Sequence, residues 1–124
     1  MKELRTEAVI QAIENGEYDE RFSEIYMDAT RSVRQKERYV RAVKEYVGQF
    51  GTGEVAIFSA PGRSEIGGNH TDHQHGEVLA ASINLDAIAV TEKTAEPTVR
   101  LVSDGCEPIL IPLNDLQKRN EEEG

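Results

Sequence analysis

The turn Gly51-Thr52-Gly53 divides the sequence into two parts whose apolar residues repeat with different periods. Before the turn, apolar residues recur every three to four positions, which is typical of helices with one buried face. After it, the β-branched and aromatic run Glu54–Ser59 predicts a buried strand. We therefore expect one α+β domain over residues 1–124, with helices over about 4–50 and a strand-rich, mostly antiparallel half over about 54–113.

Three amphipathic helices are predicted before this turn. The first covers residues 4–13 and stops at Asn15-Gly16, and the second begins near residue 18 or 19. The third is capped by Thr30 or Ser32 and continues to Phe50. Its apolar side is formed by Val33, Val40, Val43, Val47 and Phe50.

Further strands are predicted in the second half, over residues 84–93, 98–102 and 109–113. Between them, Glu96-Pro97 and Asp104-Gly105 are typical turn residues. We expect these strands to form an antiparallel meander. The polar tail 114–124 has no closing apolar element, and we expect it to be the truncated end of a longer protein.

Charge and cysteine content exclude several classes of partner. The net charge of -9 disfavours nucleic acid and anionic membranes, which proteins bind through Lys and Arg. The only cysteine, Cys106, cannot form an intrachain disulfide, which favours a cytoplasmic protein. With no histidine beside it, Cys106 is given no role. The longest apolar segment, 78–90, is interrupted by polar residues, so no membrane span is expected.

The stretch from Ser59 to Glu77 contains the residues best suited to chemistry. Pro61 and Gly62 predict a sharp turn that ends the strand and presents Arg63 rigidly. The guanidinium of Arg63 is a planar set of donors that suits a carboxylate or the oxygens of a transferring phosphoryl group. The alternative is a structural arginine paired with a nearby acid.

Gly67-Gly68, which permit a close backbone approach or a left-handed conformation, precede five consecutive polar residues, 69–73. Within this run Asp72 is the strongest candidate for a ligand contact, because a carboxylate accepts hydrogen bonds from two adjacent sugar hydroxyls. The alternative is that Asp72 caps a helix or a turn.

A metal site and a phosphate loop are weaker interpretations of the same stretch. Zinc ligands are offered by His70, Asp72, His73 and His75. Residues at these spacings converge poorly on one ion, so no metal is expected. The phosphate-binding pattern Gly-x-x-x-x-Gly-Lys-Ser/Thr does not occur.

The segment from Ala60 to His73 resembles the galactokinase signature of the GHMP kinase superfamily, Pro-Gly-Arg-x-Asn-x-x-Gly-Glu-His-x-Asp-Tyr. Six positions match it, namely Pro61, Gly62, Arg63, Gly68, His70 and Asp72. The helices before the signature and the segment 76–83 after it extend the resemblance from about residue 4 to the end of the chain.

This resemblance implies the N-terminal part of a GHMP kinase, with a ribosomal protein S5 domain 2-like fold. The parent enzyme would transfer the γ-phosphoryl of MgATP to the anomeric hydroxyl of galactose. Arg63 would then stabilise the transition state, and Asn69, His70 and Asp72 would bind the sugar.

The resemblance also implies what this chain lacks. The ATP-binding loop and the catalytic Asp are expected downstream of Gly124. The chain alone is then expected to be inactive and to bind neither ATP nor Mg²⁺ tightly. We also expect it to self-associate through surface that the missing part would cover.

Three positions depart from the family pattern. Glu65 replaces an Asn, Asn69 replaces the sugar-binding Glu, and His73 replaces a Tyr. Asn69 can hydrogen-bond a hydroxyl but supplies no carboxylate. Two alternatives therefore stay open, a kinase for a related sugar and a non-catalytic galactokinase-like sensor or regulator.

Overall fold

The computed structural model describes residues 4–27, 29–68 and 77–114. The chain divides into two compact units, Met1–Glu92 and Lys93–Gly124. Both helices and antiparallel strands are present, which confirms the predicted α+β class. None of the helices within the described ranges is long and apolar enough to cross a membrane.

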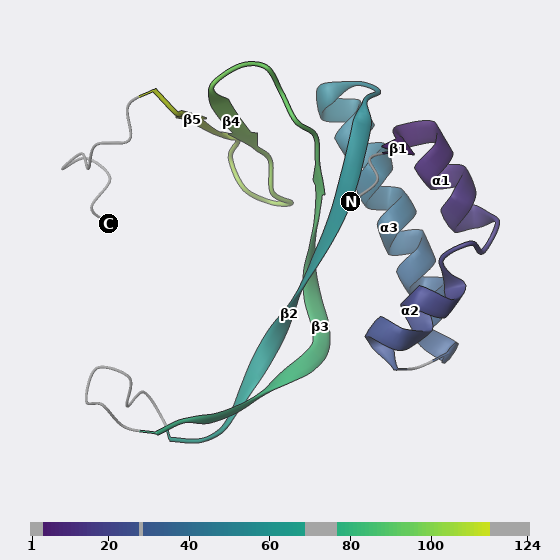
Figure 1. The fold of residues 1–124 in the computed structure, drawn as a ribbon, viewed down its shortest axis with the longest axis vertical. Helices are drawn as coiled ribbons and strands as arrows, with labels where there is room; N and C mark the ends of the chain where they lie inside the picture. The colour runs from purple at the N-terminus through teal and green to yellow at the C-terminus, as the bar shows by residue number, and fades with distance from the viewer. Residues whose placement is uncertain (1–3, 28, 69–76, 115–124) are drawn as a thin grey trace. The chain divides into compact units, whose positions relative to one another are not determined.

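Three helices lie in the described part of the first unit, as predicted (Figure 1). They are α1 (Thr6–Glu14), α2 (Asp19–Tyr26) and α3 (Ala29–Phe50). The predicted helical start at Leu4 is wrong, because Leu4–Arg5 forms the short strand β1, which pairs with Val55 and Glu54. The end of α3 is as predicted: Gly51 adopts a φ of 86° and its N–H donates to the carbonyl of Val47 at 2.9 Å.

The sheet of the first unit has the order β1-β2-β3, in which β2 (Glu54–Gly67) and β3 (Leu79–Thr91) form a long antiparallel hairpin. The second unit contains β4 (Thr98–Leu101) and β5 (Ile109–Pro112), which pair with each other. The predicted continuous meander is therefore wrong, because the described strands form two separate antiparallel sheets. The predicted strand at 84–93 is also longer than expected, since β3 starts at Leu79.

The predicted sharp turn at Pro61 and Gly62 is wrong as well. Strand β2 continues through both residues to Gly67, and Pro61 pairs with Asp86 of β3. A proline lacks the N–H donor of a ladder and is tolerated where one edge of a strand has no neighbour. Among the described residues β1 pairs with β2 only at Glu54 and Val55, which leaves that edge open beyond them.

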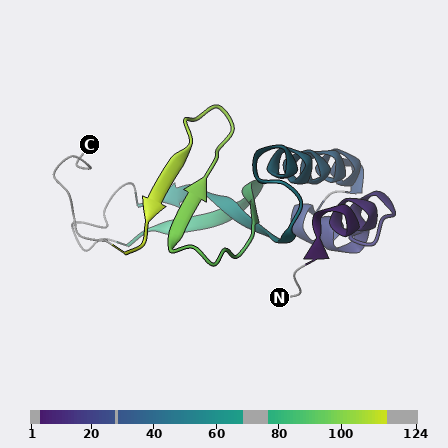
Figure 2. The same ribbon diagram turned by 90° about the horizontal axis from the view of Figure 1, so that it is seen from above.

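The core of the first unit lies between the helices and the base of the hairpin. Figures 1 and 2 show the three helices beside this base, while the rest of the hairpin extends beyond them. The core cluster consists of Val9, Ile13, Phe22, Tyr26, Tyr39, Val43 and Val55. Val55 is the only buried residue of β2, so the prediction of a buried strand over Glu54–Ser59 is wrong: the helices cover only its first part.

Candidate functional site

Arg63 lies on β2 in the exposed part of the hairpin, where it pairs with Ser82 of β3. Its side chain makes no hydrogen bond or ion pair with any other residue that the structure describes. Its guanidinium is therefore presented by a strand rather than by the predicted tight turn, and it is open to a ligand.

The predicted sugar-binding residues Asn69, His70 and Asp72 lie outside the described residues, as do His73 and His75. The residues that flank them are described. Gly68 adopts a φ of 108°, as predicted for a left-handed position, and a Cβ atom there would lie 2.5 Å from the carbonyl oxygen of Glu77. Gly68 and Glu77, the described residues on either side of the segment 69–76, thus lie close together.

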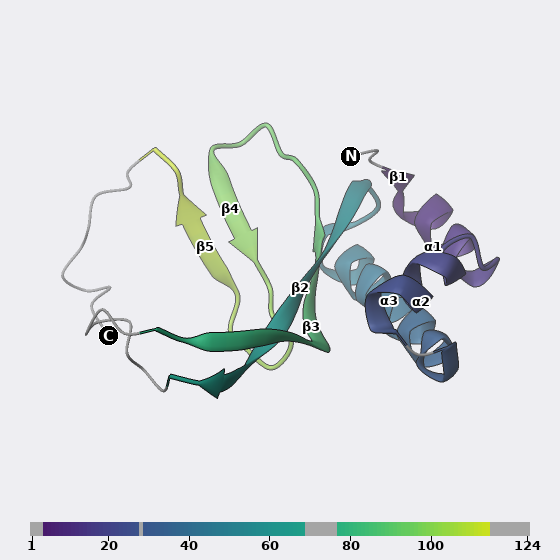
Figure 3. The ribbon, with the colours of Figure 1, turned by 60° about the horizontal axis from the view of Figure 1, so that its bottom comes forward.

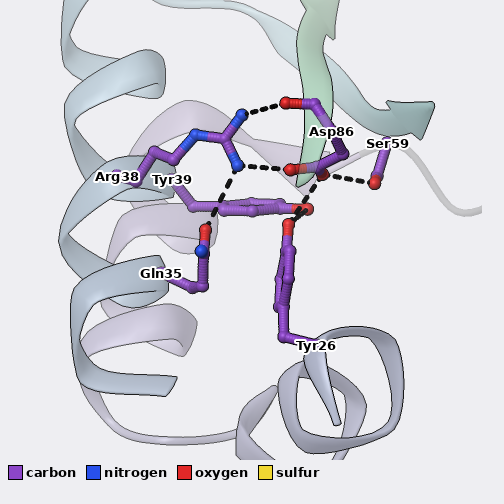
Figure 4. A network of polar contacts seen from close by, with 6 residues as sticks. All are labelled: Tyr26, Gln35, Arg38, Tyr39, Ser59 and Asp86. Carbon is purple, nitrogen blue, oxygen red and sulfur yellow. Dashed lines mark hydrogen bonds and ion pairs between the residues drawn. The ribbon is translucent and has the colours of Figure 1, made fainter. Parts of the chain in front are cut away.

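A group of polar side chains joins the helices to the base of the hairpin (Figure 4). At its centre is Asp86 of β3, whose side chain is 4% exposed. Its Oδ1 accepts a hydrogen bond from Arg38 Nη1 of α3 at 2.5 Å, and its carbonyl oxygen accepts one from Nη2 at 2.7 Å. Its Oδ2 accepts hydrogen bonds from Tyr26 of α2 at 2.7 Å and from Ser59 of β2 at 2.5 Å. We call Tyr26, Arg38, Ser59 and Asp86 the Asp86 cluster.

Two neighbours extend the Asp86 cluster. The hydroxyl of Tyr39 lies 3.0 Å from that of Tyr26, and Gln35 Oε1 accepts a hydrogen bond from Arg38 Nη1 at 3.2 Å. The ring of Tyr39 also packs edge-on against Phe22 with centroids 4.9 Å apart. The polar cluster is therefore continuous with the aromatic part of the core.

The charges of the Asp86 cluster stabilise one another. Burial alone would raise the pKa of the Asp86 carboxyl, but hydrogen bonds from Ser59, Arg38 and Tyr26 outweigh it, and this pKa lies below its ordinary value. Burial, together with the hydrogen bonds to Tyr39 and Asp86, raises the pKa of the Tyr26 hydroxyl well above its ordinary value. At neutral pH Asp86 is an anion surrounded by donors, which suits a structural role and not that of a general base.

Sequence reasoning did not identify the Asp86 cluster. Asp86 is one of the polar residues that interrupt the apolar segment 78–90, and the local sequence around Tyr26, Arg38 and Ser59 singles out none of them. The available signal was a lone carboxylate in an otherwise apolar strand segment, Leu85–Val90. A charge at such a position requires a partner, although the sequence does not say which one.

A cavity of about 700 Å³ lies between the helices and the base of the hairpin. Its lining is mostly apolar and includes Val9, Ile13, Phe22, Ile57 and Phe58. Ser59 and Asp86 contribute polar atoms to its wall, but Arg63 does not line it. The cavity nevertheless reaches Pro61 and Ser82, the residue with which Arg63 pairs.

Comparison with known proteins bears on the hairpin that carries Arg63. Residues 44–93 match the family model described as the galactokinase galactose-binding signature. The chain resembles the N-terminal portion of galactokinases. The matched range includes the whole β2–β3 hairpin and the candidate residues Arg63, Asn69, His70 and Asp72.

Three curated galactokinases are similar over about half of this chain. The protein of Enterococcus faecalis (strain ATCC 700802 / V583) is 36% identical over 62 residues, which are 50% of this chain and 16% of that galactokinase. The protein of Clostridium tetani (strain Massachusetts / E88) is 28% identical over 71 residues, 57% of this chain and 18% of the relative. The protein of Streptococcus thermophilus (strain ATCC BAA-491 / LMD-9) is 33% identical over 75 residues, 58% and 19% respectively.

The aligned region thus spans less than a fifth of each of these galactokinases. The predicted resemblance to galactokinases is confirmed over residues 44–93, which include the signature residues, and its extension from about residue 4 to the end of the chain stays a prediction. No solved structure matches the chain.

Proposed function

We propose that this chain forms the sugar-binding portion of a galactokinase-like enzyme, which transfers the γ-phosphoryl of ATP to the anomeric hydroxyl of galactose. The observation that carries the proposal is the match of residues 44–93 to the galactose-binding signature of galactokinases. The exposed position of Arg63 within that range supports it. The low cysteine content favours the cytoplasm as the place of action.

In this proposal Arg63 and the three residues Asn69, His70 and Asp72 have different roles. Arg63 stabilises charge that develops on the transferring phosphoryl group, for which a permanently charged planar donor is suited. Asn69, His70 and Asp72 hydrogen-bond the sugar hydroxyls. The close approach of Gly68 to Glu77 supports this role, because these two residues flank the segment on both sides.

ATP and Mg²⁺ belong to other parts of the proposed enzyme. No group of three or more His, Cys, Asp or Glu side chains gathers in the ranges that the structure describes. The sequence also lacks a Gly-x-x-x-x-Gly-Lys-Ser/Thr loop. In this proposal the chain contributes the sugar site and Arg63 only, and by itself it binds sugar without transferring phosphoryl.

A second candidate function rests on Asn69, which stands where the signature has a glutamate. An amide both donates and accepts hydrogen bonds, whereas a carboxylate only accepts them. This difference favours a sugar other than galactose, bound either by a kinase or by a non-catalytic sensor.

Sugar titration of the 124-residue chain, followed by NMR, tests the proposal. We expect galactose to cause saturable shifts of the amide signals of Arg63 and residues 69–76. Asp72→Ala should weaken binding by about five- to 150-fold, because it leaves a sugar hydroxyl without its acceptor. Asp104→Ala is the matched control, since Asp104 is an exposed aspartate of the second unit, and it should bind like the unmodified chain.

Each outcome of this titration has a defined meaning. Saturation by a related sugar in place of galactose would support the second candidate. Equal affinities of the Asp72→Ala and Asp104→Ala variants would remove Asp72 from the site. No saturable shift with any hexose would overturn the assignment of this hairpin to a sugar.

A further inference from the structure

The pairing of β2 with β3 changes register directly beside Asp86. Pro61 pairs with Asp86, and the next pair along the hairpin is Arg63 with Ser82. One residue of β2, Gly62, therefore faces three residues of β3, 83–85, so β3 carries a bulge of two extra residues. Bulges bend a strand and redirect the side chains that follow. Figure 3 shows β3 turning a corner along its length.

Gly62 fits closely against this bulge. A Cβ atom at Gly62 would lie 3.2 Å from Ile83 Cδ1 and 3.3 Å from the carbonyl oxygen of Leu85. Those distances are tighter than ordinary van der Waals contact, so the two strands approach each other at this point because Gly62 has no side chain.

Apolar burial does not hold the register beyond this point. In β2 every residue from Phe58 to Gly67 is exposed, and so is every residue of β3 from Leu79 to Leu85. Register is strongly specified where one face of a hairpin is buried and weakly specified where neither is. A local anchor is needed to hold the bulge in place.

We propose that Asp86 is a positioning residue, which holds the bulge of β3 next to Gly62 through its bonds to Arg38, Tyr26 and Ser59 and thereby sets the direction in which the hairpin carries Arg63. The side chain and the carbonyl of Asp86 are both bonded to Arg38, so the backbone at the start of the bulge is fixed to α3. Ser59 fixes the facing strand to the same carboxylate. That Arg63 acts on a substrate rests on the proposed function, but the anchoring of the register does not.

Without the bulge, β2 and β3 would pair in one defined alternative register. If the pairing of Pro61 with Asp86 continued without a shift, Ser64, three residues further, would face Ile83, whereas it faces Ala81 in the structure. The strands would then be displaced by two residues, about 7 Å along the hairpin. NMR contacts between backbone protons distinguish Ser64–Ala81 from Ser64–Ile83 in a protein of 13.8 kDa.

The experiment compares the unmodified chain with Asp86→Asn and with the matched control Asp104→Asn, without sugar. We expect the Ser64–Ala81 contact in the unmodified chain and in the control. In Asp86→Asn we expect that contact to be lost and amide exchange of residues 63–65 to become at least about tenfold faster, which corresponds to losing one hydrogen bond to a charged group. Exchange at Val43 of α3 reports the overall loss of stability and should also become faster, so the Ser64–Ala81 contact is the deciding measurement.

A purely structural role would give a different result. It would speed exchange across the first unit, Val43 included, while the Ser64–Ala81 contact persisted, and this result would overturn the proposal. If Asp86→Asn loses its helical circular dichroism, Ser59→Ala decides instead, because it removes one donor and leaves the bonds of Arg38 intact. If Ser59→Ala keeps the Ser64–Ala81 contact and exchanges its amides at the rate of the control, the proposal is overturned. If Ser59→Ala loses that contact and exchanges faster at residues 63–65, the proposal is supported. Because no sugar is present, failure here is distinct from failure of the proposed function.

Discussion

Asp86 keeps its charge at the base of the hairpin because donors from three other elements surround it. Tyr26 comes from α2, Arg38 from α3 and Ser59 from β2. Removing one partner from such a group leaves a poorly solvated charge behind, and this cost exceeds the value of a surface ion pair. Arg38 is 29% exposed, so water reduces the cost on its side. The carboxylate itself has little access to water.

Acid should remove the stabilisation that Asp86 provides. Its pKa is lower in the folded chain than in the unfolded one, so the unfolded chain takes up the proton first as the pH falls. The contribution is complete above about pH 4, the ordinary pKa of an aspartate, and is lost as the pH falls through the folded pKa. We expect Asp86→Asn to lower the free energy of unfolding at pH 7 by about 2 to 3 kcal/mol and to have a smaller effect near pH 3.

Urea denaturation at both pH values measures this difference. Asp104→Asn serves as the control, because an exposed aspartate should change the free energy of unfolding little at either pH. A loss of equal size at pH 7 and pH 3 would show that the charge of Asp86 is not what stabilises the fold.

Arg63 can be singled out from the sequence and Asp86 cannot, for a physical reason. Arg63 belongs to a compact motif whose residues lie within a few positions of one another, so the motif can be recognised without knowing the fold. The partners of Asp86 are 27, 48 and 60 residues away, and nothing in the local pattern pairs them. Contacts of this kind depend on how the helices and the hairpin pack.

At the level of elements, the helices were predictable and the strands were less so. A helix of 22 residues such as α3 repeats its apolar face several times, so its period is visible in the sequence. Strand β2 has few buried positions, and Pro61 and Gly62 resemble the end of a strand when read locally. They are tolerated because one edge of β2 has no neighbour there among the described residues and because β3 bulges around Gly62.

Two neighbouring glycines at the tip of the hairpin, Gly67 and Gly68, allow the same substitution to be compared at a strained and an unstrained position. Gly68 has a φ of 108° and a Cβ atom there would meet backbone, whereas a Cβ atom at Gly67 would have nothing within 4 Å. Gly68→Ala should therefore cost about 1 to 3 kcal/mol of backbone strain, while Gly67→Ala should cost much less. Amide exchange at the outer pair Glu65 and Ala80 measures the effect, and we expect at least about tenfold faster exchange in Gly68→Ala only. Similar exchange in both variants would contradict the backbone geometry at Gly68.

At the level of the whole molecule, the described residues expose many large apolar side chains. Ile66, Leu79 and Leu85 of the first unit are each more than 60% exposed, and so is Leu110 of the second. Exposed apolar surface and open strand edges favour association between chains.

We therefore predict that the purified chain self-associates as its concentration rises. Light scattering should report an average mass above 13.8 kDa at high concentration, and Leu85→Lys should shift the onset to higher concentration. Leu85 is suited to this test because it is 66% exposed and its side chain makes no core contact. A mass that stays at that of the monomer at all concentrations would rule out this prediction.

The Asp86 cluster also sets an order of events during synthesis. Tyr26 precedes Asp86 by 60 residues, and a ribosome that adds about 5 to 20 residues per second needs roughly 3 to 12 seconds to cover that interval. During this time α2 and α3 can pack through Phe22 and Tyr39, but the guanidinium of Arg38 has no carboxylate from β3 to bind. The helices therefore leave the ribosome before their partner on β3 exists. The bonds between Arg38, Tyr26 and Asp86 form only when the second strand of the hairpin leaves the exit tunnel.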